Sequence, residues 1–228
     1  MNRLLFRLTR VLISVAVVAA ATPALSQTIF IDNWSFESSA QSCTAGPNCF
    51  QLGVIPGWTV SSIPRTATFK PSIGTGGIFP AGVPDGVNVA GVGNQDGTAS
   101  IMQTTVAALE ANRTYTLSAA IGHRADFPFS GYSIQLYAGN TYLASSSALT
   151  PDAGTFLTDT LTFNSGTSPA GLGQLITIQL VALVPGGQVD FDTITLNSAA
   201  VPAPAAAIHL LTCLGVIGMW CRKHRRIS

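Results

Sequence analysis

Apolar and polar residues alternate along the middle of the chain. The alternation is clear in four segments, with threonine, serine or glutamine between the apolar positions: 114–122, 132–137, 160–163 and 176–182. A period of two is typical of strands that bury one face, and threonine suits the other face of a pleated sheet. We therefore predict strands in these segments.

Turn residues separate these runs along the chain. They occur at Pro56-Gly57, Asp85-Gly86, Asp96-Gly97, Gly139-Asn140 and Pro185-Gly186-Gly187. Short strands with turns at this spacing are typical of one antiparallel β-sandwich or barrel. We predict an all-β fold, a single antiparallel β-sandwich over 27–198. Residues 64–97 are expected to be mostly loop with short strands, and 106–111 to form one helical turn at most.

The first residues are organised like the leader of an exported protein. Three arginines precede an apolar stretch over 11–21, and small residues end it before Gln27. A basic region, an apolar region and a small-residue cleavage site are typical of a secretory signal peptide. We predict that 1–26 is a signal peptide cleaved between Ser26 and Gln27. An uncleaved anchor is the alternative, disfavoured by the short apolar run.

The last residues predict a membrane anchor. Residues 205–221 carry no formal charge and are followed by the basic tail 222–228. A helix of this length spans roughly 26 Å at about 1.5 Å per residue, which is short for a bilayer core. We predict a transmembrane helix with its tail in the cytoplasm and the body outside. The alternative is a buried core helix.

Charge is sparse and unevenly distributed. Only 9% of the residues are charged and the formal net charge is +1, whereas an average protein has about 25% charged residues. Seven basic residues lie in the two ends, so the middle combines four basic with all ten acidic residues, a formal charge of −6. The composition excludes a disordered chain, and the charge argues against a nucleic-acid partner.

The C-terminal segments resemble a known sorting signal. The linker 199–204 contains Val201, Pro202 and Pro204, and an apolar helix and a basic tail follow. This order resembles the PEP-CTERM signals of Gram-negative bacteria in their VPxP or VPLPA-like form, although Ala203 replaces the usual glutamate. The resemblance implies an exosortase-type sorting enzyme as partner. It also implies an inner-membrane anchor, or release to the cell surface or extracellular matrix.

The body resembles exported domains with a galactose-binding-like jelly roll, including some carbohydrate-binding modules. The matching pieces are Asn33-Trp34-Ser35-Phe36-Glu37, Ile55-Pro56-Gly57-Trp58 and the closing 189–196. The resemblance implies a structural calcium held by acids of the first and last strands, here Glu37 and Asp192, and less readily Asp190. A phase slip near Asp192 predicts a β-bulge. The alternative is that these acids are solvated and cap a turn. No cofactor is required.

Two further groups of residues are candidates for chemistry. Cys43 and Cys49 enclose a short turn-rich segment, which favours a disulfide in an exported protein over free thiols or metal ligands. Aromatic rings that can stack on sugars are provided by Trp58, Phe127, Phe129 and Tyr132.

Recognised catalytic motifs are absent from the sequence. It contains neither a G-x-S-x-G elbow nor an H-E-x-x-H motif, and the body has one histidine, His123. We therefore predict no catalytic residue and no enzyme activity. The predicted role is a structural or adhesive envelope or exopolysaccharide-matrix protein, processed at its sorting signal. A carbohydrate-binding module with a polysaccharide partner is the alternative, and a glycoside hydrolase with two carboxylates is less favoured.

Overall fold

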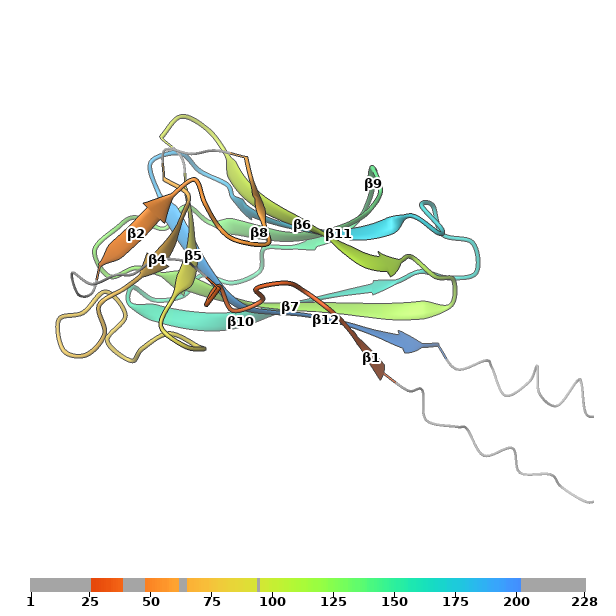
Figure 1. Ribbon diagram of the computed structural model, residues 1–228, viewed down its shortest axis with the longest axis horizontal. Helices are drawn as coiled ribbons and strands as arrows, with labels where there is room; N and C mark the ends of the chain where they lie inside the picture. The colour runs from red at the N-terminus through yellow and green to blue at the C-terminus, as the bar shows by residue number, and fades with distance from the viewer. Residues whose placement is uncertain (1–25, 39–47, 62–64, 94, 202–228) are drawn as a thin grey trace, which may run out of the picture. The chain divides into compact units, whose positions relative to one another are not determined.

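The computed structural model describes residues 26–38, 48–61, 65–93 and 95–201. These residues form twelve strands and no helix. The strands make two antiparallel sheets that lie one above the other (Figure 1). The predicted all-β sandwich is confirmed at this level.

The larger sheet has seven strands. Its order is β10 (Thr155–Asn164), β7 (Arg113–His123), β12 (Gln188–Ala200), β5 (Val89–Gly93), β4 (Ala67–Lys70) and β2 (Cys49–Leu52), and β1 (Ser26–Ile29) also pairs with β12. The smaller sheet has the order β3 (Thr59–Val60), β6 (Ala99–Ala108), β11 (Leu175–Ala182), β8 (Tyr132–Ala138) and β9 (Thr141–Ser146). Every pairing between these strands is antiparallel.

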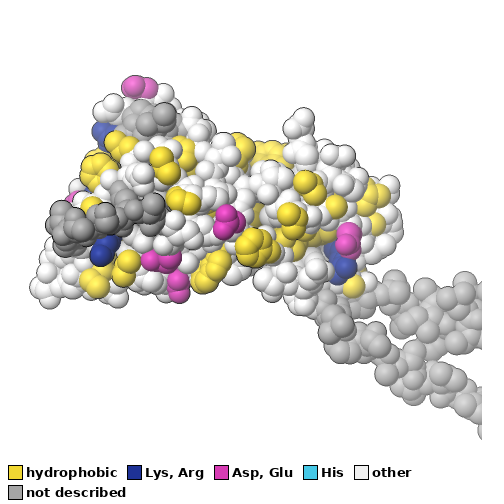
Figure 2. Space-filling model, in the orientation of Figure 1, with side chains coloured by type: hydrophobic (Ala, Val, Ile, Leu, Met, Phe, Trp, Pro, Cys, Tyr) yellow, Lys and Arg dark blue, Asp and Glu magenta, His cyan; other side chains and the backbone are white. Residues whose placement is uncertain are grey.

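The main core lies between the two sheets. Val92, Ile121 and Phe191 contribute to it from the larger sheet, and Ile134 and Leu180 from the smaller one, all fully buried. Burying a side chain of this kind contributes about 1.5–3 kcal/mol. Charged side chains are few on the face seen in Figure 2, and apolar ones are scattered over it. The core rather than surface charge therefore stabilises the sandwich.

A second apolar cluster covers the outer face of the larger sheet. Phe69 and Val89 project from β4 and β5 and pack against Ile78 and Phe79, which belong to the connection between these strands. The long connection therefore covers one end of the sheet, away from the main core. This covered end carries the candidate site.

Strand β12 contains the predicted irregularity. Its register with β7 shifts between Asp192 and Thr195, and Thr193 adopts a positive φ of 52°. The amide of Ile194 then donates to the carbonyl of Trp34, at 2.9 Å. The predicted β-bulge is confirmed.

The remaining predictions on the fold had mixed outcomes. Strands are present in the four segments with alternating residues. No helical turn forms over 106–111, where one at most was expected, since β6 continues through Ala108. Strand β12 continues to Ala200, so the first two residues of the predicted linker belong to the sheet. Within the described segments, no helix is long and apolar enough to cross a bilayer.

Several predictions lie outside the described residues. These are the signal peptide up to residue 25, the sorting motif beyond Val201, the predicted membrane helix 205–221 and the basic tail 222–228. Signal cleavage, sorting and anchoring therefore stay predictions. Ser26 and Gln27, at the predicted cleavage site, are the first two residues of β1.

Candidate functional site

The site lies on the outer face of the larger sheet and is centred on the start of β12. Side chains alternate between the faces of a strand, and Val189 and Phe191 point into the main core. Gln188 and Asp190 therefore project from the opposite face. Asp190 is nevertheless completely buried, because neighbouring segments cover that face.

Glycines flank Asp190 in the strands on both sides. Asp190 pairs with Gly122 of β7 and with Gly91 of β5. A Cβ atom at Gly91 would lie 2.5 Å from Nε2 of Gln188, and one at Gly122 would collide with the ring of Phe156. Real Cβ atoms do not approach other atoms so closely. Glycine at positions 91 and 122 therefore leaves the space over the sheet that the side chains of Gln188 and Phe156 occupy.

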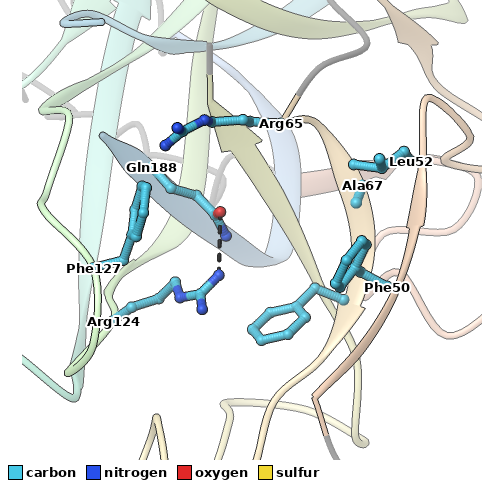
Figure 3. A pocket seen from close by; sticks show the side chains of 8 residues that line it. Phe50, Leu52, Arg65, Ala67, Arg124, Phe127 and Gln188 are labelled. Carbon is cyan, nitrogen blue, oxygen red and sulfur yellow. Dashed lines mark hydrogen bonds between the residues drawn. The ribbon is translucent and has the colours of Figure 1, made fainter. Parts of the chain in front are cut away.

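A pocket of about 300 Å³ opens beside this position. Its polar groups come from Arg65, Arg124 and Gln188. The rest of the lining is apolar and consists of Phe50, Leu52, Ala67, Phe69 and Phe127. Figure 3 shows Phe127 on one side of Gln188 and Phe50 with Leu52 across the space. A cavity with aromatic walls and a few polar groups is typical of a site for a small organic ligand.

Arg124 connects the pocket wall to Gln188. Its guanidinium forms two hydrogen bonds of 2.9 Å with the carboxylate of Asp126, and this contact lowers the pKa of Asp126. The same group donates to Oε1 of Gln188 at 3.2 Å, as Figure 3 shows, and lies 4.7 Å from the centre of the Phe69 ring. Arg124 thereby fixes the orientation of the Gln188 amide.

The oriented amide then reaches Asp190. Nε2 of Gln188 donates to Oδ1 of Asp190 at 2.8 Å, whereas Oδ2 accepts no hydrogen bond from the described residues. Burial raises the pKa of Asp190 to about 7, against the lowering effects of Arg124 and of the bond from Gln188. Protonation would turn the unpartnered oxygen into a donor. The arrangement can therefore hold an acidic proton one side chain away from the pocket.

Glu37 and Asp192 lie together at a different place, around the turn 85–88. Oε1 of Glu37 accepts from the amides of Val87 and Asn88 at 2.9 and 2.7 Å, and Oδ2 of Asp192 accepts from the amide of Asp85 at 2.9 Å. Burial also raises the pKa of Asp192 to about 7.

The fit of this group to calcium can be judged from its hydrogen bonds. The remaining oxygens of Glu37 and Asp192 accept from the side-chain amide of Asn88 and the backbone amide of Thr193. Within the described ranges, no three acidic, histidine or cysteine side chains converge as metal ligands. Asp190, the third predicted ligand, faces Gln188 instead. Calcium binding stays a prediction, and no chemical step is derived from it.

The four aromatic residues predicted to bind sugars do not form one surface. Phe127 lines the pocket, whereas Trp58 and Tyr132 are buried in the main core. Phe129 is half-buried, and its ring centre lies 5.1 Å from that of His123. Tyr132 donates to the buried Asp159 at 2.5 Å, so its hydroxyl is occupied within the core.

Cys49 is disulfide-bonded. Its predicted partner, Cys43, lies outside the described residues, so the pairing itself stays a prediction.

Comparison with known proteins assigns the chain to a class and then to a family. The fold and the pocket define a β-sandwich with a site for a small organic ligand. The chain belongs to the HpiC1-like family, described as HpiC1 cyclase, whose model matches residues 27–197. No curated protein matches the sequence.

Solved structures of cyclases from Fischerella are similar to the chain. The apo form of a cyclase from Fischerella sp. is 28% identical, with a TM-score of 0.66 over 76% of this chain and 96% of that one. The Stig cyclase Fisc from Fischerella sp. TAU, in complex with (3Z)-3-(1-methyl-2-pyrrolidinylidene)-3H-indole, is 27% identical, with a TM-score of 0.68 over 77% and 99%. A Fischerella sp. TAU cyclase in complex with 4-(1H-indol-3-yl)butan-2-one is 26% identical, with a TM-score of 0.68 over 78% and 100%.

These findings correct the functional predictions. The prediction that the chain is not an enzyme is wrong, because the family and the similar structures are cyclases. The same findings overturn the structural or adhesive role, the carbohydrate-binding module and the glycoside hydrolase. The sequence lacks the common nucleophile and zinc motifs, but the family shows that their absence does not exclude an enzyme.

Several residues of the site had no role in the sequence-based predictions. Phe50, Arg65, Phe69 and Arg124 come from separate strands and loops and meet only through the sheet register. One available signal was Asp190 itself, a carboxyl between the apolar residues Val189 and Phe191 in a closing strand.

Proposed function

We propose that the chain is a cyclase that isomerises an unsaturated, indole-type aromatic substrate by acid catalysis. Asp190 would supply the proton. The observation that carries the proposal is the contact between this completely buried carboxyl and Gln188 at the wall of an aromatic pocket. The indole class is suggested by the ligands of the similar Fischerella cyclases.

The pocket suits a flat, largely apolar ligand. The exposed ring of Phe50 offers a face for stacking, whereas the guanidinium groups of Arg124 and Arg65 lie over the rings of Phe69 and Phe127. Burial keeps water from the Asp190 carboxyl, which strengthens electrostatic interactions around that group. These walls would therefore orient the substrate beside the carboxyl.

The proposed reaction balances without any co-reactant. The Asp190 O–H transfers its proton to a substrate C=C bond, and a second π bond of the same molecule attacks the resulting cation to form the ring C–C bond. Loss of a proton from the adjacent carbon to the Asp190 carboxylate restores the acid. The product is an isomer of the substrate.

Gln188 controls access to the acid in this scheme. It lies on the same face as Asp190, lines the pocket and donates to Oδ1. A rotation of its side chain, guided by the bond from Arg124, would expose the carboxyl to the ligand. Gln188 is thus a positioning residue.

Incubation with 3-alkenylindoles in water and in D₂O tests the proposal. We expect a product of unchanged mass and new chromatographic retention, heavier by one deuterium in D₂O because the acid exchanges its proton with solvent. Asp190→Asn should form no product, whereas Asp152→Asn, at an exposed acid outside the pocket, should behave as wild type. Equal turnover by Asp190→Asn would refute the role of this carboxyl.

We also propose that the enzyme works outside the cytoplasm. The basic and apolar leader over 1–26 supports export, and the disulfide-bonded Cys49 is expected in an oxidising compartment. N-terminal sequencing of protein from an exported fraction should begin at Gln27. Protein that keeps Met1 and stays in the cytoplasmic fraction would contradict export.

A further inference from the structure

The two arginines of the pocket differ in how their charges are balanced. Arg124 is held by Asp126 through two hydrogen bonds. Arg65, at the other end of the Gln188 side chain in Figure 3, forms no ion pair with any carboxylate of the described residues. Its guanidinium instead lies over the ring of Phe127, 5.0 Å from the ring centre. A positive charge therefore faces the pocket without an anionic partner among the residues that the structure describes.

This charge is conspicuous in a body that is mostly acidic. The middle of the chain has only four basic residues against ten acidic ones, and two of the four line this pocket. The contact with Phe127 holds the guanidinium at the pocket wall. Guanidinium groups bind carboxylates through two parallel N–H donors, which an arginine in contact with a ring can still present.

We propose that the substrate of this site carries a carboxylate that Arg65 binds. The inference rests on the proposed cyclase function and specifies the substrate class further: an aromatic ring against Phe50 and an anionic group at the Arg65 side of the pocket. Asp126 already neutralises Arg124, so the selectivity for an anion is assigned to Arg65.

A pair of isosteric ligands tests this assignment on the full-length protein. The first is 4-(1H-indol-3-yl)butan-2-one, and the second is 3-(1H-indol-3-yl)propanoate, in which a carboxylate oxygen replaces the terminal methyl group. Titration calorimetry at pH 7 should show at least tenfold tighter binding of the carboxylate. Arg65→Gln should remove this preference while changing the affinity for the ketone less than twofold, and Arg65→Lys should keep part of it.

A matched control and a second ligand pair make every outcome decisive. Arg113→Gln changes a basic residue that is paired with Glu110 outside the pocket, and it should leave both affinities unchanged. Equal binding of the two indoles, or an equal loss of both in Arg65→Gln, would overturn the inference and leave the cyclase proposal standing.

The second pair of ligands is 4-phenylbutan-2-one and 3-phenylpropanoate. If only 3-phenylpropanoate binds, and does so through Arg65, the anion site stands and the indole class falls. If neither carboxylate binds, the inference is overturned.

Discussion

Asp190 is the residue whose replacement gives the sharpest prediction. Its pKa is raised from the ordinary 3.8 to about 7, chiefly by burial. A carboxyl with a raised pKa binds its proton more tightly in the folded than in the unfolded protein. The free energy of unfolding contributed by this group therefore falls as the pH rises from about 4 to about 7, and stays low above that.

The size of this effect follows from the two pKa values. One pKa unit corresponds to about 1.4 kcal/mol, so the ionised carboxyl destabilises the fold by about 4 kcal/mol above pH 7. Asp190→Asn removes this dependence. The new amide places a donor where Oδ2 has no partner, which costs about 1–3 kcal/mol at every pH. Between pH 4 and pH 8.5, the free energy of unfolding of Asp190→Asn should therefore rise by about 4 kcal/mol relative to that of the wild type.

Urea denaturation followed by tryptophan fluorescence at several pH values measures this difference. The control is Asp152→Asn, at an exposed carboxyl, which should show a constant difference. We expect Asp190→Asn to gain relative stability at high pH while it loses turnover, because a group retained for chemistry need not stabilise the fold. A pH-independent difference between Asp190→Asn and wild type would show that the carboxyl titrates normally and would refute the reasoning.

Three other variants test the supporting structure. Gly91→Ala places a methyl group against Gln188 and should break the hydrogen bond from Gln188 to Asp190. Turnover should then fall at least tenfold and the pKa of Asp190 should rise; an unchanged dependence of turnover on pH would contradict this. Tyr132→Phe removes the hydrogen bond to Asp159 in the core and should lower the free energy of unfolding in urea by about 1–3 kcal/mol. A variant as stable as the wild type would contradict this. If Glu37 holds calcium as the resemblance to jelly-roll domains implies, EDTA should lower the Tm of the wild type but not of Glu37→Gln. A Tm indifferent to EDTA would argue against calcium.

The strands of the fold were predictable where one face is apolar. The alternation in β7, β8, β10 and β11 identified them directly. Strand β6 was missed because its buried face includes polar residues, Gln103 and Thr105. Gln103 donates to the carbonyls of Asp32 and Gly57, and such distant partners are not visible in local sequence.

The site was much less predictable than the fold. Phe127 was named for its ring and Asp190 for its charge, but neither was assigned its place in the pocket. The neighbours of Asp190 are set by pairing with β5 and β7, whose residues lie about 70 to 100 positions earlier in the sequence. Sequence alternation indicates which face a residue occupies, but it does not indicate which strands lie beside it.

The pairing of β1 with the end of β12 has a practical consequence for engineering. Ser26 pairs with Ala199, whereas Asp190 lies nine residues earlier on β12, about 30 Å away at 3.3 Å per residue. Figure 1 shows β2, β4 and β5 at the opposite end from this pair. A support or fusion partner attached after Val201 would therefore leave the ligand entrance unobstructed. The same adjacency makes a short peptide bridge between the two strands feasible, so circular permutants can open the chain elsewhere while keeping the sheet.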